Sequence, residues 1–272
     1  MRRVKKEDYN SCQSYYWNYQ RILAEDYYIP YLLENSAALK FKLNNFSAID
    51  IGCGNGGFID AFKTINKKSS ESVIKGIEIK KFSSWSNRDT DYSVHNILED
   101  SNKNYKQKYD LVILRDVIEH IHKGDKDHFI KEAASFMKTN GEMLVTFPPY
   151  LSPFGLHQQA IMKSFLKYIP FLSLLPKSAL KRIVNQFENE DTWLEIEEII
   201  DSGMTISNFK KILKRTGLTI YKKRHFSIRP SHQIRYGAKT LRSPFGCFPL
   251  VREFLVLGTC YILKVKNNNP SN

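Results

Sequence analysis

The stretch that decides the fold is Ala48-Ile49-Asp50-Ile51-Gly52-Cys53-Gly54-Asn55-Gly56-Gly57-Phe58. A short apolar run ends in glycines, and apolar residues with helical spacing follow, at Phe58, Ile59, Phe62 and Ile65. Glycine has no side chain, so a strand, a glycine loop and a helix in this order let the backbone approach a ligand closely and aim amide groups at it. The stretch therefore predicts a ligand-binding turn of the kind that holds nucleosides.

The glycines alone do not decide which nucleoside is bound. Gly52, Gly54 and Gly57 satisfy the G-x-G-x-x-G pattern of dinucleotide-binding loops. However, Asp50 stands two residues before the first glycine, where a carboxylate would repel a pyrophosphate and attract a cation. The acid favours a positively charged ligand.

Strand-like and helical patterns alternate through the first 150 residues, as in a parallel sheet covered on both faces. The strand candidates are 46–51, 73–79, 92–95, 109–114 and 142–147. After Pro148-Pro149 the alternation stops, and 150–204 is predicted to be helical without a strand. It resumes with an amphipathic helix over 205–216 and two strands, over 218–228 and 253–265.

A second motif, Asp116-Val117-Ile118-Glu119-His120, follows the fourth strand candidate. Residues 50–56, 112–121 and 140–147 together resemble three motifs of class I S-adenosylmethionine-dependent methyltransferases, in order and at suitable spacing. The resemblance implies an α/β, Rossmann-like class I methyltransferase fold, with a seven-stranded, mostly parallel sheet, an antiparallel last strand and a helical cap insertion after strand 5. We expect four parts: an N-terminal helical segment (1–45), the cofactor-binding methyltransferase domain (46–149 and 205–266), the cap insertion (150–204) and a disordered tail (267–272).

The resemblance implies S-adenosylmethionine as cofactor and assigns it a set of residues. Asp50 would fix the loop, Glu78 would accept both ribose hydroxyls, and Asn96, where the family more often has Asp, would meet the adenine. The full set is Asp50, Gly52, Gly54, Gly56, Glu78, Asn96, Ile97, Arg115 and Asp116. The competing interpretations are an ordinary exposed acid at Glu78, a plain turn residue at Asn96 and a helix cap at Asp116.

Histidine is the expected base. Methyl transfer from a sulfonium is an in-line displacement, so positioning matters most, but a hydroxyl nucleophile also benefits from a general base. His157 lies on a Pro/Gly-rich loop after the fifth strand, at the sheet edge where ligands bind in this class of fold, and is the first candidate. His120 is the second and His232 the third; an ordinary loop histidine and a packing role are the alternatives.

Four residues of the sequence also have the types that bind a metal. Asp116, Glu119, His120 and His157 are similar to the metal-binding constellation of small-RNA 3′-terminal 2′-O-methyltransferases. Glu-His after the fourth strand is widespread in metal-free members of the larger family, however, and this chain has Asp at the first position. We therefore expect no metal.

The charge pattern points to an anionic partner. The 272 residues include 41 Lys+Arg against 28 Asp+Glu, a net charge of +13. No acid occurs in 150–187 or in 222–252, and both segments leave the sheet at the edge expected to hold the ligand. The candidate substrate-binding residues there are Tyr150, Arg229, His232, Arg235 and Tyr236. Basic segments that are simply solvated surface are the alternative.

We therefore predict an enzyme that O-methylates a saccharide, anionic or lipid-linked, because 147–158 and 229–237 are also similar to loops of bacterial glycan-biosynthesis methyltransferases. An RNA methyltransferase is the first alternative, but no separate RNA-binding module is recognisable, so nucleic acid is the less favoured partner. A non-catalytic binding module of the same fold is the second. With no secretory signal at the start, a cytoplasmic location is expected. Residues 161–175 either touch an anionic membrane at its inner face or pack as a cap.

Overall fold

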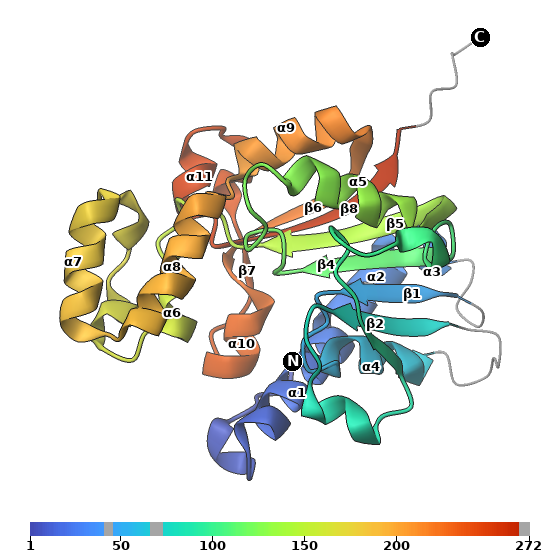
Figure 1. Ribbon diagram of the computed structural model, residues 1–272, viewed down its shortest axis with the longest axis horizontal. Coiled ribbons are helices and arrows are strands. Elements are labelled where there is room, and N and C mark those ends of the chain that lie inside the picture. The colour runs from blue at the N-terminus through green and yellow to red at the C-terminus, as the bar shows by residue number, and fades with distance from the viewer. Residues whose placement is uncertain (41–45, 66–72, 267–272) are drawn as a thin grey trace.

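A computed structural model describes residues 1–40, 46–65 and 73–266 (Figure 1). Within these residues, one sheet has eight strands in the order β3-β2-β1-β4-β5-β8-β6-β7. The strands are β1 (Ala48–Ile51), β2 (Ile74–Glu78), β3 (Asp91–Val94), β4 (Tyr109–Arg115), β5 (Met137–Phe147), β6 (Leu218–Ile228), β7 (Leu241–Arg242) and β8 (Gly258–Val265). The tail over 267–272, expected to be disordered, lies outside the described residues.

The sheet is mostly parallel. β1 pairs in parallel with β2 and β4, and β3 and β5 extend this arrangement on either side. β8 runs antiparallel between β5 and β6. The Rossmann-like methyltransferase fold predicted from the sequence, with its antiparallel last strand, is confirmed.

Two details of the sheet differ from the prediction. An eighth strand, β7, is added because the connection after β6 folds back, so that Leu241 and Arg242 pair with the end of β6. β8 begins at Gly258 instead of residue 253, because Val251–Leu255 forms the short helix α11. Both differences lie in the long connection between β6 and β8.

The central strands have no solvent-facing side. All four residues of β1 are buried, and alternate residues pack into two different cores. Since successive side chains of a strand point to opposite faces, near-continuous apolar runs are what a sheet covered on both faces requires. One core contains Ala48, Leu111, Ile113, Leu144 and Ile262, and the other contains Ile49, Val112, Leu114, Val145 and Tyr261.

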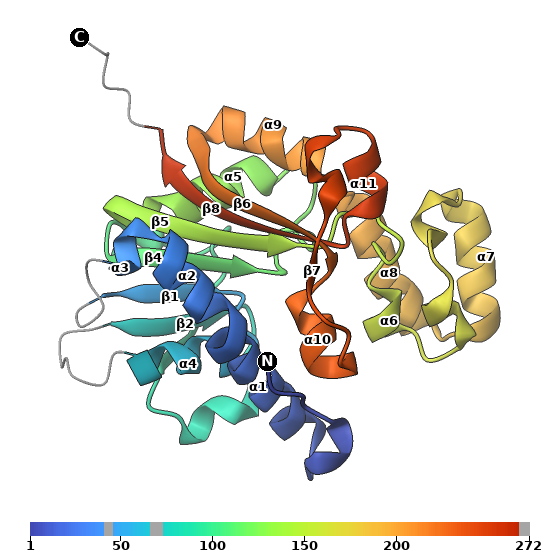
Figure 2. The same cartoon turned by 180° about the vertical axis from the view of Figure 1, so that it is seen from behind.

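Helices cover both faces of the sheet (Figures 1 and 2). On one face lie α1 (Cys12–Leu23), α2 (Ile29–Asn35) and α4 (Gly57–Ile65), with the short α3 (Ala37–Lys40) near β4 and β5. On the other lie α5 (Lys126–Ser135) and α9 (Ile206–Thr216). The Thr205 side chain caps α9 by accepting a hydrogen bond from the Asn208 N–H, and Gly217 ends it in left-handed backbone.

A group of helices lies to one side of the sheet (Figure 1). In the sequence these helices follow β5 and precede α9. It comprises α6 (Gln158–Ile161), α7 (Lys177–Phe187) and α8 (Glu190–Ser202). These helices share a core of their own, built on Leu156, Leu180, Val184, Trp193 and Ile196. This is the helical cap expected after the fifth strand; its status as a separate part of the chain stays a prediction.

The carboxyl ends of the parallel strands face the cap and the remaining helix, α10 (Pro230–Tyr236), which follows β6 (Figure 2). α1 lies against α10 on the same side. Ligands bind at this edge in open α/β sheets, so the site is sought here. Among the described residues, none of the helices combines the length and the apolar character that crossing a membrane would require.

Candidate active site

The glycine loop after β1 bends through left-handed backbone. Gly52, Gly54 and Gly56 have φ angles of +74°, +53° and +85°. A side chain at Gly52 would overlap Val117, and one at Gly56 would overlap Tyr92, whereas one at Gly54 would meet nothing within 4 Å. The loop needs glycine for its path, and beside Gly54 it leaves open space for a ligand.

Glu78, the last residue of β2, holds this loop. Its carboxylate accepts hydrogen bonds from the Gly54 N–H (3.1 Å) and the Ile79 N–H (2.8 Å). Trp85, which sequence reasoning missed, donates its indole N–H to the Gly54 carbonyl (2.9 Å) and stacks on Tyr92 with ring centroids 5.0 Å apart. The available signal was an aromatic pair flanking the start of the third strand.

Asp50 is buried at the end of β1, with 2% of its surface exposed, and its Oδ1 atom has no hydrogen-bond partner among the residues that the structure describes. Burial raises the pKa of Asp50 to about 7; Arg115 opposes this and Glu78 adds to it. A cation placed beside this carboxyl would favour the ionised form. The environment therefore suits a positively charged ligand.

Asn96 and Ile97 follow β3 in a tight turn. The Asn96 Oδ1 accepts from the Leu98 N–H (3.1 Å), and the Asn96 N–H donates to Asp100 (2.6 Å). Ile97 is buried, and its carbonyl accepts from the Asn102 amide (2.9 Å). These contacts are those of a turn residue; the contact with adenine stays a prediction.

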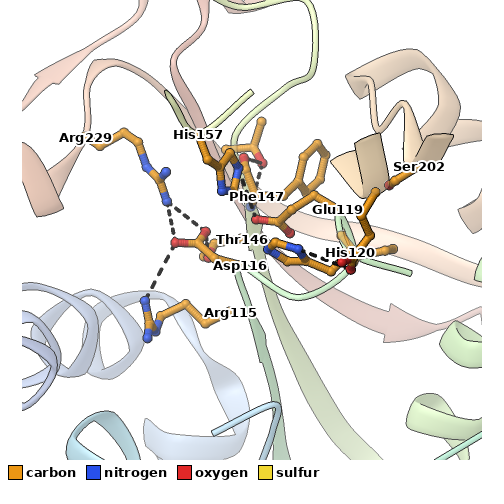
Figure 3. Close-up of polar contacts among 12 residues, drawn as sticks. Arg115, Asp116, Glu119, His120, Thr146, Phe147, His157, Ser202 and Arg229 are labelled. Carbon is orange, nitrogen blue, oxygen red and sulfur yellow. Dashed lines mark hydrogen bonds and ion pairs between the residues drawn. The ribbon is translucent and has the colours of Figure 1, made fainter. Parts of the chain in front are cut away.

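Arg115 is the last residue of β4, and Asp116 follows it (Figure 3). The Arg115 guanidinium donates to Gln20 of α1 and lies 4.7 Å above the Phe58 ring. Asp116 has left-handed backbone (φ +55°), and its carboxylate accepts two hydrogen bonds from Arg229, at 2.6 and 2.7 Å. Burial alone would raise the pKa of Asp116, but Arg229 and Arg115 hold it well below its usual value. The Asp116–Arg229 pair ties the end of β4 to the start of α10.

A cleft of about 170 Å³ opens beside this pair. α1, the loops after β4 and β5, and α10 all contribute to its walls. It brings together most of the residues predicted for catalysis and substrate binding, and Asp116, which was predicted to bind the cofactor, lines it with them. The catalytic and substrate-binding candidates in its walls are His120, His157, Arg229, His232, Arg235 and Tyr236. Tyr19 of α1 lines it as well.

Tyr150 is placed elsewhere. Its hydroxyl donates to the Ser173 carbonyl (3.1 Å), its ring packs against the core of the cap, and it is not among the residues that line the cleft. The chain turns tightly here, since Gly155 lies directly against the Tyr150 carbonyl. Position after the fifth strand was therefore a poor guide to where this side chain lies.

The two candidate bases face each other at the cleft (Figure 3). The His120 and His157 rings have centroids 5.6 Å apart and are nearly perpendicular. Burial lowers the pKa of His157 to about 3, and His120 adds to the effect, so the ring is neutral at pH 7. Its Nε2 lies 3.7 Å from Glu119 Oε1 and accepts or donates no hydrogen bond within the described part of the chain. A neutral imidazole is the form that can accept a proton. His232, the third candidate, is also neutral, because burial lowers its pKa to about 4.

Glu119 completes a group of metal-ligand types. It is buried, and neither carboxyl oxygen has a hydrogen-bond partner in residues 1–40, 46–65 and 73–266. Burial together with Asp116 raises its pKa well above the usual value. Ligand atoms of Glu119, His120 and His157 lie within 4.8 Å of one another, and these residue types can hold a divalent metal. Asp116, the fourth member of the constellation considered from the sequence, is instead paired with Arg229. The absence of a metal stays a prediction.

Arg235 places a positive charge in the wall of the cleft. Its guanidinium lies over the rings of Tyr19 (5.6 Å) and Tyr236 (5.2 Å), and it makes no ion pair within residues 1–40, 46–65 and 73–266. The wall is therefore both positive and aromatic, which suits an acceptor that carries negative charge.

The fold and this site define a methyltransferase. Residues 19–223 match the model of a family described as "Methyltransferase domain", and the chain belongs to this family. The family uses S-adenosylmethionine, the cofactor predicted from the sequence.

Individual relatives are more distant. The ubiquinone biosynthesis O-methyltransferase of Pelagibacter ubique (strain HTCC1062) is 32% identical over 108 residues, which make up 38% of this chain and 42% of the relative. The match thus spans less than half the length of that protein.

Solved structures share the fold. The plantazolicin methyltransferase BpumL in complex with SAH has a TM-score of 0.50 and 14% identity, covering 93% of this chain and 89% of its own. An S-adenosylmethionine-dependent methyltransferase from Clostridium acetobutylicum ATCC 824 has a TM-score of 0.50 and 11% identity, covering 90% and 92%.

Proposed function

We propose that this methyltransferase transfers the methyl group of S-adenosylmethionine to a hydroxyl of a saccharide, either anionic or part of a lipid-linked glycan intermediate, with a histidine as base. The observation that carries the proposal is the cleft itself. It combines His157, whose ring is neutral, with Arg235, which forms no ion pair with an acid among the described residues. A base and a cation in one cleft suit an acceptor that has both a reactive hydroxyl and a negative charge.

The residues of the glycine loop fit the cofactor. Open space beside Gly54 and the unpartnered oxygen of the buried Asp50 provide a cradle for a cationic nucleoside. Glu78, already in contact with this loop, would bind the ribose hydroxyls, and Arg115 and Asp116 would border the methionine end. When bound, the cofactor supplies an electrophilic methyl group on a positively charged sulfur.

His157 would take the proton of the acceptor hydroxyl at Nε2. The carboxylate of Asp116, which Arg229 and Arg115 keep ionised and which favours a charged His157, would stabilise the imidazolium that forms. His120, beside it, is the second candidate for this role. Arg235 would bind the anionic group of the acceptor while Tyr19 and Tyr236 pack against its ring, which holds the hydroxyl in line with the methyl group.

One observation favours a second acceptor. The relative from Pelagibacter ubique is named for ubiquinone biosynthesis, so an intermediate of that pathway is the second candidate substrate. Aromatic walls would suit a flat ring as well as a sugar.

The test is a transfer assay with the full chain, S-adenosylmethionine labelled in the methyl group, and separate fractions of glycans, lipid-linked glycan intermediates, quinone precursors and RNA. We expect label in a glycan fraction, mass spectrometry showing a gain of one methyl, and a raised KM in Arg235→Gln. Label in the quinone fraction would move the assignment to the second candidate. Label in RNA, with binding that weakens steeply as salt rises, would favour the RNA methyltransferase. Cofactor binding without transfer to any fraction would indicate a non-catalytic module.

A further inference from the structure

The connection between β6 and β8 exposes a dense apolar surface. Leu250 is 81% exposed and Phe248 is 56% exposed. The other exposed apolar side chains of this 241–255 surface are Leu241, Phe245, Val251, Phe254 and Leu255. An apolar group of this kind on a folded protein usually marks a site of interaction.

The surface is anchored to the folded body. The Ser243 N–H donates to the His225 carbonyl (2.8 Å), and Gly246 packs directly on the His225 ring. At the other end, the buried Glu253 accepts hydrogen bonds from the Ile206 N–H (2.9 Å) and the Ser207 N–H (2.8 Å). The backbone is therefore fixed at both ends with its apolar side chains outward.

The charges around the surface are positive. Glu253 is the only acid between residues 222 and 255, and it is buried and hydrogen-bonded. Lys239 and Arg242 are exposed beside the apolar side chains, and neither makes an ion pair within the described ranges. Burial and repulsion from the nearby Arg252 and Lys223 lower the pKa of Lys210, and the buried Glu253, 3.8 Å from Arg252, offsets part of this repulsion. A negatively charged partner would relieve this repulsion.

We propose that the 241–255 surface seats the protein on an anionic membrane, with the apolar side chains among the lipids and the surrounding cations against the headgroups. Exposed apolar residues combined with unpaired Lys and Arg are the features that interfacial membrane binding requires. The inference goes beyond the proposed function, because it concerns where the enzyme works and not which acceptor it methylates.

The position of the surface agrees with this role. The same connection carries α10, whose His232 and Arg235 line the cleft, and Leu257, two residues after the surface, lines it too. A protein bound to the membrane through the 241–255 surface would thus hold its cleft near the membrane. The sequence-based candidate for membrane contact, 161–175, buries Met162, Leu166 and Leu172 in the core of the cap. It also exposes apolar side chains, among them Phe165, Tyr168 and Leu174, so contact through this segment stays a prediction that the experiment must separate from contact through the 241–255 surface.

The experiment is flotation of the full chain with two kinds of vesicle, phosphatidylcholine alone and phosphatidylcholine with about one third phosphatidylglycerol. The test variant is Phe248→Glu with Leu250→Glu. The matched variant is Phe165→Glu, because Phe165 is 54% exposed on the cap segment that the sequence favoured. S-adenosylhomocysteine binding, measured for every variant, reports on folding without relying on methyl transfer.

We expect at least about tenfold more binding to anionic than to neutral vesicles, weakening as salt rises, and a loss of about tenfold or more in the double variant alone. No binding to anionic vesicles would overturn the inference, as would equal binding by the double variant. Loss of binding in Phe165→Glu alone would place the contact on the cap. A concentration-dependent dimer that the double variant abolishes, without vesicle binding, would make a second copy the partner. None of these results depends on the identity of the acceptor.

Discussion

Asp50 should make cofactor affinity depend on pH. Its pKa of about 7 means that a cationic ligand must displace a proton below that pH but meets a carboxylate above it. We therefore expect the affinity for S-adenosylmethionine to rise by about tenfold between pH 6 and pH 8. Calorimetry across this range measures the change, and Asp50→Asn should flatten it. The same pH dependence in Asp50→Asn would assign the titration to another group.

His157 should be needed for turnover and not for cofactor binding. His157→Gln is expected to lower kcat by about 10²–10⁴-fold while the affinity for S-adenosylhomocysteine stays unchanged. His122→Gln is the control, because His122 is exposed on the loop after β4. Burial holds the ring neutral far below pH 6.5, so the wild-type rate should not fall near that pH, as it would with an ordinary histidine base. Full activity in His157→Gln would remove the assignment.

The group Glu119, His120 and His157 allows the expectation of no metal to be tested directly. We expect protein purified without chelators to contain no stoichiometric divalent metal and to keep its activity after dialysis against EDTA. Elemental analysis by mass spectrometry measures the metal content, and the transfer assay measures the activity that remains after dialysis. Stoichiometric metal that Glu119→Gln loses would contradict the expectation and make His157 a ligand.

The sequence predicted single residues best where the backbone conformation requires one residue type. Gly52, Gly54 and Gly56 stand where φ is positive, and a strand followed by glycines announces this locally. The Asp116–Arg229 pair could not be predicted, because its members are 113 residues apart in sequence and meet only when β6 joins the sheet. Tyr150 shows the converse, since a residue on the expected loop points into the cap.

Among the elements, the loop after β4 depends on one buried lysine at the start of α5. The Lys126 ammonium donates to the carbonyls of Ile118 and Ile121 and to the Ser202 hydroxyl, at 2.6–2.8 Å. Lys126→Met would leave these acceptors unsatisfied, so we expect the free energy of unfolding to fall by about 2–3 kcal/mol. We expect kcat to fall as well, because Glu119 and His120 lie on this loop. Urea denaturation measures the free energy of unfolding, and the transfer assay measures kcat. Lys131→Met, at an exposed position of α5, should change neither. Equal stability of the two variants would refute the anchoring role.

Elements with a clear hydrophobic period were predicted closely. β6 occupies the expected 218–228, and α9 follows its cap Thr205. Residues 253–257 were misassigned to a strand, because a short apolar run fits a helix as well as a strand. Helix α11 depends on Glu253 bonding to the start of α9, a contact that sequence alone does not reveal.

At the scale of the whole molecule, the cap has a core separate from those of the sheet. We therefore expect α7 and α8 to open together, and their amides to exchange with solvent faster than those of β4 and β5. Hydrogen exchange followed by mass spectrometry measures both. S-adenosylhomocysteine should slow exchange in the turn between β1 and α4 and leave the cap unaffected. Exchange of the cap at the rate of the central strands would mean that it unfolds only with the sheet.

The last strand along the chain fills an internal gap: β8 lies between β5 and β6, pairing with both. A chain made only as far as residue 257 therefore leaves one edge of β5 and one edge of β6 unpaired, and an unpaired strand edge can pair with a neighbouring molecule. The halves can join only after residues 258–265 leave the ribosome, so translation pausing before that point would prolong the state most prone to aggregate.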